Sequence, residues 1–167
     1  MTTATWVRGI LAEDFGVDPA RVRWVTFEEP HVAEYRNPPN VERAPEGADM
    51  LAMLREGALD AAIVGELPQD ADLRPVVPDP EAAARAWRAR TGASVQINHM
   101  VVVKDTVSDE EAADLYALLR ESRAAAGNPP MNPFGIEENR ANLEAALDCV
   151  WRQGMIPRRY RVPELFR

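Results

Sequence analysis

The sequence has little of what common metal-binding, disulfide-bonded or cofactor-dependent proteins need. Its 167 residues include one cysteine and two histidines. One thiol forms no intramolecular disulfide, and two histidines far apart in the sequence show no metal-ligand spacing. Phosphate-binding loops, dinucleotide-binding glycine patterns and nucleophile elbows are also missing. We therefore expect no metal and no cofactor, and we expect Cys149 to be a small buried hydrophobic residue in a reducing compartment.

Basic charge and long apolar runs are scarce as well. The chain has 19 Lys and Arg against 27 Asp and Glu, a formal charge of −8 at pH 7. A nucleic-acid partner is not expected, because its phosphates require a basic stripe and the sequence offers only a short arginine cluster at 158–161. No apolar run reaches the roughly 18 residues of a membrane span, and the first residues lack a secretion signal. The expectation is a cytoplasmic protein with no membrane partner.

Apolar residues at helical spacing predict five helices. The first has Thr2 or Thr3 as its N-cap, and the fourth opens with a capping-box pattern formed by Ser108 and Glu111. The helices are expected before Gly16, at 49–56, at 81–90, from Ser108 to about Ala126, and before Gly154. The apolar face of the last helix consists of Leu143, Leu147, Val150 and Trp151.

Three short runs predict strands between these helices. Residues 23–27 are rich in β-branched and aromatic side chains, whereas 61–64 and 101–103 are unbroken apolar runs typical of buried parallel strands. Residues 30–47 carry four prolines and are expected to form a long loop. Helices that alternate with apolar strands indicate an α/β fold, with a mixed or parallel sheet flanked by helices.

Polar residues near the ends of these elements are the candidate functional residues. Ligands of open α/β sheets bind beyond the carboxyl ends of the strands, which points to Glu28 and Gly65. Thr2 and Arg8 lie near the start of the first helix, where free amides and the helix dipole favour a carboxylate. His99 flanks an apolar strand and is a candidate proton donor near neutral pH. A solvated Arg8 and a purely structural His99 are the alternatives.

Five stretches, in one order along the chain, resemble the 4,5-dihydroxyphthalate decarboxylase family, whose fold is similar to that of type II periplasmic solute-binding proteins. They lie at 2–17, 24–30, 53–61, 91–99 and 132–140, and include the sequences W-V-R-G, I-N-H and P-F-G-I-E-E-N-R. The resemblance implies a second-lobe α/β domain at 1–127 and a returning C-terminal loop and helix at 128–167, without the first lobe.

The resemblance also implies an uncovered helix face. In the family, the C-terminal helix packs on the first lobe, so its apolar face here needs another cover. We expect that a second copy of the chain, or a rearrangement, buries this face, because apolar patches of that size rarely stay exposed. A homodimer is therefore the expected assembly.

The activity implied by the resemblance is decarboxylation of a hydroxylated aromatic dicarboxylic acid, with a small aromatic or carboxylate ligand. In that scheme Arg8 binds a substrate carboxylate, His99 transfers the proton and Glu28 contacts a ring hydroxyl. The implied substrate-binding residues are Thr2, Trp6, Gly65, Asn139 and Arg140. Two alternatives stay open: a non-catalytic solute-binding-type protein for a small carboxylate, and an inactive truncated homologue.

Overall fold

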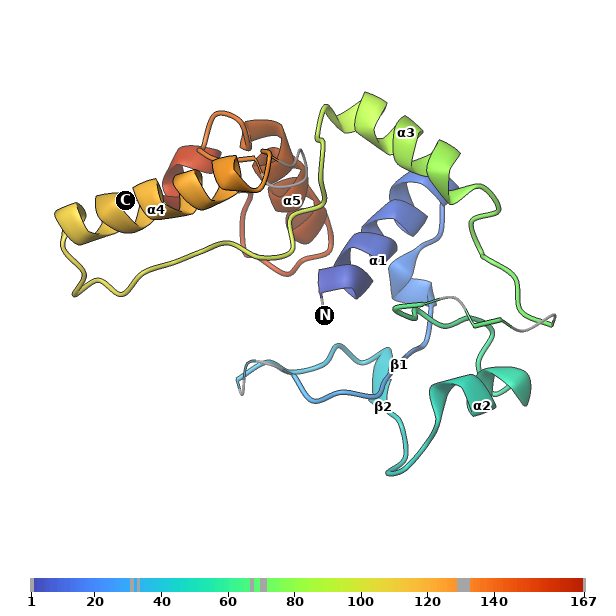
Figure 1. Ribbon diagram of the computed structural model, residues 1–167. Helices are drawn as coiled ribbons and strands as arrows, with labels where there is room; N and C mark the ends of the chain where they lie inside the picture. Colours follow the sequence, from blue (N-terminus) through green and yellow to red (C-terminus); the bar gives the residue numbers. More distant parts are fainter. Residues whose placement is uncertain are drawn as a thin grey trace. The chain divides into compact units, whose positions relative to one another are not determined.

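The computed structural model describes residues 2–30, 32, 34–66, 68–69, 72–128 and 133–166. The chain forms two compact units, Met1–Pro78 and Asp79–Arg167. The first unit contains α1 (Thr2–Phe15), the 3-10 helix η1 (Pro19–Arg21), β1 (Trp24–Thr26), β2 (Val41–Arg43) and α2 (Met50–Arg55) (Figure 1). The second contains α3 (Pro80–Thr91), α4 (Asp109–Ala125), α5 (Arg140–Arg152) and the 3-10 helix η2 (Val162–Leu165). The protein is therefore α/β, with helices and a small parallel sheet.

Each of the five predicted helices is present, and local signals explain several of their ends. Asp49 caps α2 by accepting a hydrogen bond from the amide of Ala52 (2.7 Å). The capping box of α4 forms as expected, since the Ser108 amide donates to Glu111 Oε2 (2.9 Å) and the Glu111 amide donates to Ser108 Oγ (3.3 Å). Gly92 ends α3 at φ +70°, a left-handed conformation that favours glycine.

The start of α1 differs from the prediction. The helix already includes Thr2 and Thr3, so neither threonine has the extended backbone of an N-cap residue. The spacing of Trp6 and the following apolar residues identified the helix correctly. The position of its first turn depends on the preceding backbone, which apolar spacing does not specify.

The sheet consists of β1 and β2, paired in parallel with Trp24 opposite Val41 and Thr26 opposite Arg43. The prediction that 30–47 is entirely loop is therefore wrong, because β2 lies inside that segment. Asn40 fastens the start of β2: its carbonyl accepts a hydrogen bond from the Trp24 amide (2.8 Å), and its side-chain amide donates to the Val22 carbonyl (2.9 Å). Three residues are too few to show strand periodicity in the sequence.

The strands predicted at 61–64 and 101–103 are also wrong, because both segments lie outside regular secondary structure. Val101 and Val102 are 73% and 82% exposed, the opposite of a buried strand. A β-branched sequence favours the extended backbone, but a strand forms only with a hydrogen-bonded neighbour. The described parts of the chain pair only β1 with β2. Gly65 consequently does not follow a strand.

The apolar face of α5 is covered in part by the chain's own C-terminal segment. Leu143 and Leu147 form a buried cluster with Val162 of η2. Partly buried side chains that surround this cluster are Ile97, Ile156, Tyr160 and Phe166. Two outcomes were expected for this face: burial by a second copy of the chain, or burial after a rearrangement. The contacts show that the chain's own C-terminal segment buries part of it. Pairing with a second copy stays a prediction, as does the division at residue 127.

Two other residues of α5 differ in exposure. Trp151 is exposed, so the predicted apolar face is not buried along its whole length. Cys149 is buried, and the side-chain amide of Gln153 lies 3.1 Å from its sulfur. This burial confirms the expectation of a small packed thiol.

The C-terminal segment is held by an ionic cluster whose strength depends on pH. Glu164 accepts hydrogen bonds from Arg158 Nη2 (2.9 Å) and from the Arg161 amide (2.7 Å). These bonds favour the carboxylate, chiefly the bond from Arg158, and lower the pKa of Glu164 from 4.5 to about 2. Because the pKa is lower in the folded state, the stabilisation is complete above pH 4.5 and is lost as the pH falls toward 2.

We predict that Glu164→Gln lowers the Tm at pH 7, and that the difference from wild type shrinks between pH 4.5 and pH 2. Thermal unfolding followed by circular dichroism across this range measures the effect. Glu46→Gln, at an exposed position in the first unit, is the matched control and is expected to follow the wild type. A Tm difference that persists unchanged at pH 2 would contradict the assignment.

Candidate functional site

Arg8 is held against an aromatic side chain in the first unit. Its guanidinium carbon lies 5.6 Å from the centre of the Trp24 ring at the start of β1, within the range of a cation–π interaction. The Arg8 Nε atom is buried and has no hydrogen-bond partner among the described residues. The side chain therefore does not simply extend into solvent, and its charged group is positioned beside a flat apolar surface.

Glu28 lies just beyond the carboxyl end of β1, where it was predicted. Its side chain is exposed, and its carbonyl accepts a hydrogen bond from Thr26 Oγ1 (3.1 Å). The neighbouring Glu29 forms an ion pair with Arg43 of β2 (3.1 Å). Arg8 and Glu28 are thus both associated with β1, one facing its first residue and the other following its last.

The remaining candidates of the first unit have different surroundings. Trp6 is buried in the manner of a packing residue, while Thr2 is partly exposed in the first turn of α1. Gly65 is exposed, and, its two chain neighbours aside, no atom of the described residues lies within 4 Å of the position that a Cβ would take. A side chain would fit there, so crowding does not require a glycine at this position.

His99 belongs to the second unit and is exposed, outside any helix or strand. It precedes the exposed Val101–Val102 pair rather than flanking a strand, because that strand does not form. The imidazole is consequently accessible to small molecules from solvent.

Asn139 and Arg140 lie together at the start of α5, and both side chains have partners within the chain. The Asn139 side-chain amide donates to the carbonyls of Pro133 (2.8 Å) and Gly135 (2.9 Å). Arg140 forms an ion pair with Glu137, with an Nε–Oε2 distance of 2.9 Å. The hydrogen bond between these two side chains lowers the pKa of Glu137 and raises the pKa of Arg140. Asn139 therefore organises the turn that precedes α5.

Asn142 is a polar residue of the second unit that sequence reasoning missed. It is 1% exposed, and its Oδ1 accepts hydrogen bonds from the amides of Ser94 (2.8 Å) and Val95 (3.2 Å). It thereby ties the segment after α3 to α5. The available signal was its place on one helical face with Ala146 and Cys149, where a polar residue is unexpected unless it is hydrogen-bonded.

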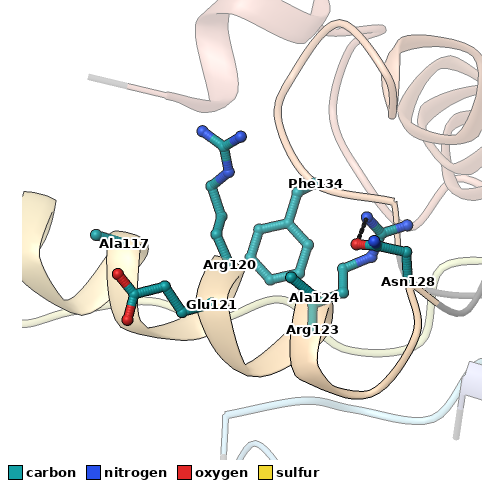
Figure 2. Close-up of a pocket in the computed structure, with 7 residues that line it drawn as sticks. All are labelled: Ala117, Arg120, Glu121, Arg123, Ala124, Asn128 and Phe134. Atoms are coloured by element: carbon teal, nitrogen blue, oxygen red, sulfur yellow. Dashed lines mark hydrogen bonds between the residues drawn. The ribbon is translucent and has the colours of Figure 1, made fainter.

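A second feature that was missed is a hollow of about 400 Å³ beside the C-terminal half of α4 (Figure 2). The Phe134 ring lies between the side chains of Arg120 and Arg123. The guanidinium carbon of Arg123 is 5.8 Å from the centre of that ring, and Arg123 Nη1 donates to Asn128 Oδ1 (3.3 Å). The lining residues are Ala117, Arg120, Glu121, Arg123, Ala124, Asn128 and Phe134.

Within the residues that the structure describes, no three His, Cys, Asp or Glu side chains gather in a way that could hold a metal ion. No helix in the described ranges has both the length and the apolar character needed to cross a bilayer.

Comparison with known proteins finds a curated protein of similar sequence. The sequence is 29% identical over 122 residues to a 4,5-dihydroxyphthalate decarboxylase from Comamonas testosteroni. The match covers 66% of this chain and 37% of the length of that protein. No protein-family model matches the chain. The similarity indicates a distant relationship to this decarboxylase, in agreement with the family resemblance of the sequence.

Proposed function

We propose that the protein is a decarboxylase of a hydroxylated aromatic dicarboxylic acid such as 4,5-dihydroxyphthalate. The observation that carries the proposal is the 29% identity to the decarboxylase from Comamonas testosteroni. The proposal includes the fold that the resemblance implies, part of a type II periplasmic-binding-protein-like architecture. The placement of Arg8 beside Trp24 supports a carboxylate-binding role independently of that identity.

Substrate binding is assigned first to residues around β1. A guanidinium group binds a carboxylate through two parallel hydrogen bonds, and the Trp24 ring beside Arg8 offers an apolar surface to an aromatic ligand. The exposed carboxylate of Glu28, beyond β1, is suited to accept a hydrogen bond from a ring hydroxyl. Together these groups recognise the three features of the substrate class: its acid group, its ring and its hydroxyls.

The second carboxylate of the substrate is assigned to Arg140. This side chain already pairs with the carboxylate of Glu137, so substrate binding exchanges one carboxylate partner for another. Asn139 is assigned a positioning role, because its amide holds the turn from which Arg140 projects. Thr2, Trp6 and Gly65 complete the proposed set of substrate-binding residues.

The proposed reaction replaces one ring carboxylate by hydrogen. The ring carbon that bears the leaving carboxylate takes a proton from His99, and the hydroxyl groups supply electron density for this step. The bond to the carboxylate then breaks, its electron pair returns to the ring, and CO₂ leaves. The imidazole regains its proton from water. The step needs neither an oxidant nor a reductant, because CO₂ leaves without the electron pair of the broken bond.

The experiment that tests the function is incubation of the purified chain with 4,5-dihydroxyphthalate, with measurement of released CO₂ and of 3,4-dihydroxybenzoate. We predict that Arg8→Ala raises KM by about tenfold or more, because it removes a charge-assisted pair to the substrate carboxylate. Arg21→Ala, which alters an exposed arginine of the first unit, is the control and is expected to leave KM unchanged.

The same samples separate the proposal from the solute-binding alternative. Calorimetry measures binding of 4,5-dihydroxyphthalate directly. Binding without CO₂ release would favour a non-catalytic carboxylate-binding protein and would reject the decarboxylase. Equal KM values for Arg8→Ala and wild type, with unchanged Tm, would remove Arg8 from the site.

A further inference from the structure

We propose that the hollow beside α4 is a binding site for a small planar aromatic carboxylate. It lies entirely within the second unit, and none of the residues assigned to decarboxylation lines it. Its volume of about 400 Å³ is toward the lower end of the roughly 300–1,000 Å³ of small-molecule pockets, which suits a ligand with one ring.

The charge of the hollow favours an anion. Its lining contains two guanidinium groups, from Arg120 and Arg123, and one carboxylate, from Glu121, whereas the whole chain has a formal charge of −8. The two arginines are three residues apart on α4, so they project from neighbouring positions of one helical face. This end of the helix dipole is negative, so the anion must be held by the arginine side chains rather than by helix amides.

Both arginines contact other side chains of the second unit. Arg123 packs on the Phe134 ring and donates to Asn128 Oδ1 (Figure 2). Arg120 lies 6.0 Å from the centre of the Tyr116 ring, one turn earlier on α4. Side chains already held by such contacts lose less conformational freedom when they bind a carboxylate.

The aromatic part of the recognition comes from Phe134. Its ring lies between the two arginine side chains and lines the hollow, and its centre is 5.7 Å from that of Tyr116 at an interplanar angle of 50°. Tilted and offset ring pairs at such distances are favourable, and a third ring in the hollow would extend the arrangement. An anion without a ring would interact only with the arginines, and an uncharged aromatic ring would interact only with Phe134. An aromatic carboxylate interacts with both and is therefore the best fit.

The test is a titration of the full ¹⁵N-labelled chain with benzoate, monitored by amide chemical shifts. We expect saturable shifts at Ala117, Ala124 and Phe134, with a dissociation constant on the order of 1 mM. Cyclohexanecarboxylate has the same charge without the aromatic ring and is expected to bind at least threefold more weakly. Inorganic phosphate tests the charge alone and is also expected to bind more weakly.

Variants separate the contributions of charge and ring. Arg120→Glu changes an exposed side chain, so the fold is expected to persist, and benzoate affinity is expected to fall at least tenfold. Phe134→Leu should weaken benzoate binding but leave phosphate binding unchanged. Arg88→Ala, at an exposed position on α3, is the matched control and should bind benzoate like wild type.

The results that would overturn the proposal are specific. They are a lack of saturable shifts at 10 mM benzoate, saturable shifts confined to residues away from α4 and Phe134, or equal binding of benzoate, cyclohexanecarboxylate and phosphate, which would indicate unspecific anion attraction. Arg8→Ala is expected to retain the benzoate shifts at Ala117 and Ala124, because the proposed decarboxylation site uses other residues. Loss of CO₂ release and loss of these shifts are therefore independent results.

Discussion

His99→Gln is expected to lower the rate of CO₂ release from 4,5-dihydroxyphthalate by about 10²–10⁴-fold, the usual contribution of a general acid. Glutamine retains a polar side chain of similar size, but it has no proton to transfer near neutral pH. His99 is exposed and outside regular structure, so the substitution removes no buried contact. The expected effect is on kcat, with KM changed little, because the proton is delivered in the transition state.

The chain provides its own matched control for this experiment. His31→Gln replaces the second histidine, which lies outside the described residues, and is expected to leave kcat unchanged. Calorimetry with 4,5-dihydroxyphthalate then distinguishes lost chemistry from lost binding. Equal kcat values for His99→Gln and wild type would show that another group protonates the ring.

Asn142→Leu is expected to lower the free energy of unfolding by about 1–3 kcal/mol, the cost of leaving buried hydrogen-bonding groups unsatisfied. The leucine is apolar and offers no acceptor to the amides of Ser94 and Val95, which now donate to Asn142 Oδ1. Urea denaturation followed by circular dichroism measures the change. The effect is large for one substitution because Asn142 connects two segments that are distant in sequence.

Two further variants identify the cause of this loss. Asn142→Asp keeps an acceptor for both amides, but it replaces the donor to Asn139 Oδ1 by an oxygen of a buried carboxyl group, so it should destabilise less at low pH, where that group is protonated, than at pH 7. Asn98→Ala changes an exposed amide of the same unit and should alter stability by no more than about 0.5 kcal/mol. Equal stabilities of Asn142→Leu and wild type would mean that solvent replaces the lost acceptor.

The sequence by itself determined the helices, because their signals are satisfied within a few residues. The Ser108–Glu111 capping box, which formed as predicted, and Gly92 at the end of α3 act on backbone groups next to them. Burial of Cys149 was also predicted, from a single thiol in a segment that the sequence indicates to be helical. The distant relationship to a decarboxylase was visible in the order of short motifs and agrees with the measured identity.

The sequence predicted β1, at 23–27, but only the tertiary structure decided the other strands and the surroundings of polar groups. Val101 and Val102 have strand-forming side chains but no neighbouring strand, whereas the short polar β2 pairs with β1 because Asn40 holds it there. The acceptor role of Asn142 and the hollow at Phe134 likewise depend on residues far apart in the sequence or on opposite sides of a loop. Helix hydrogen bonds close within one turn, while strands and binding sites require partners that only the folded chain brings together.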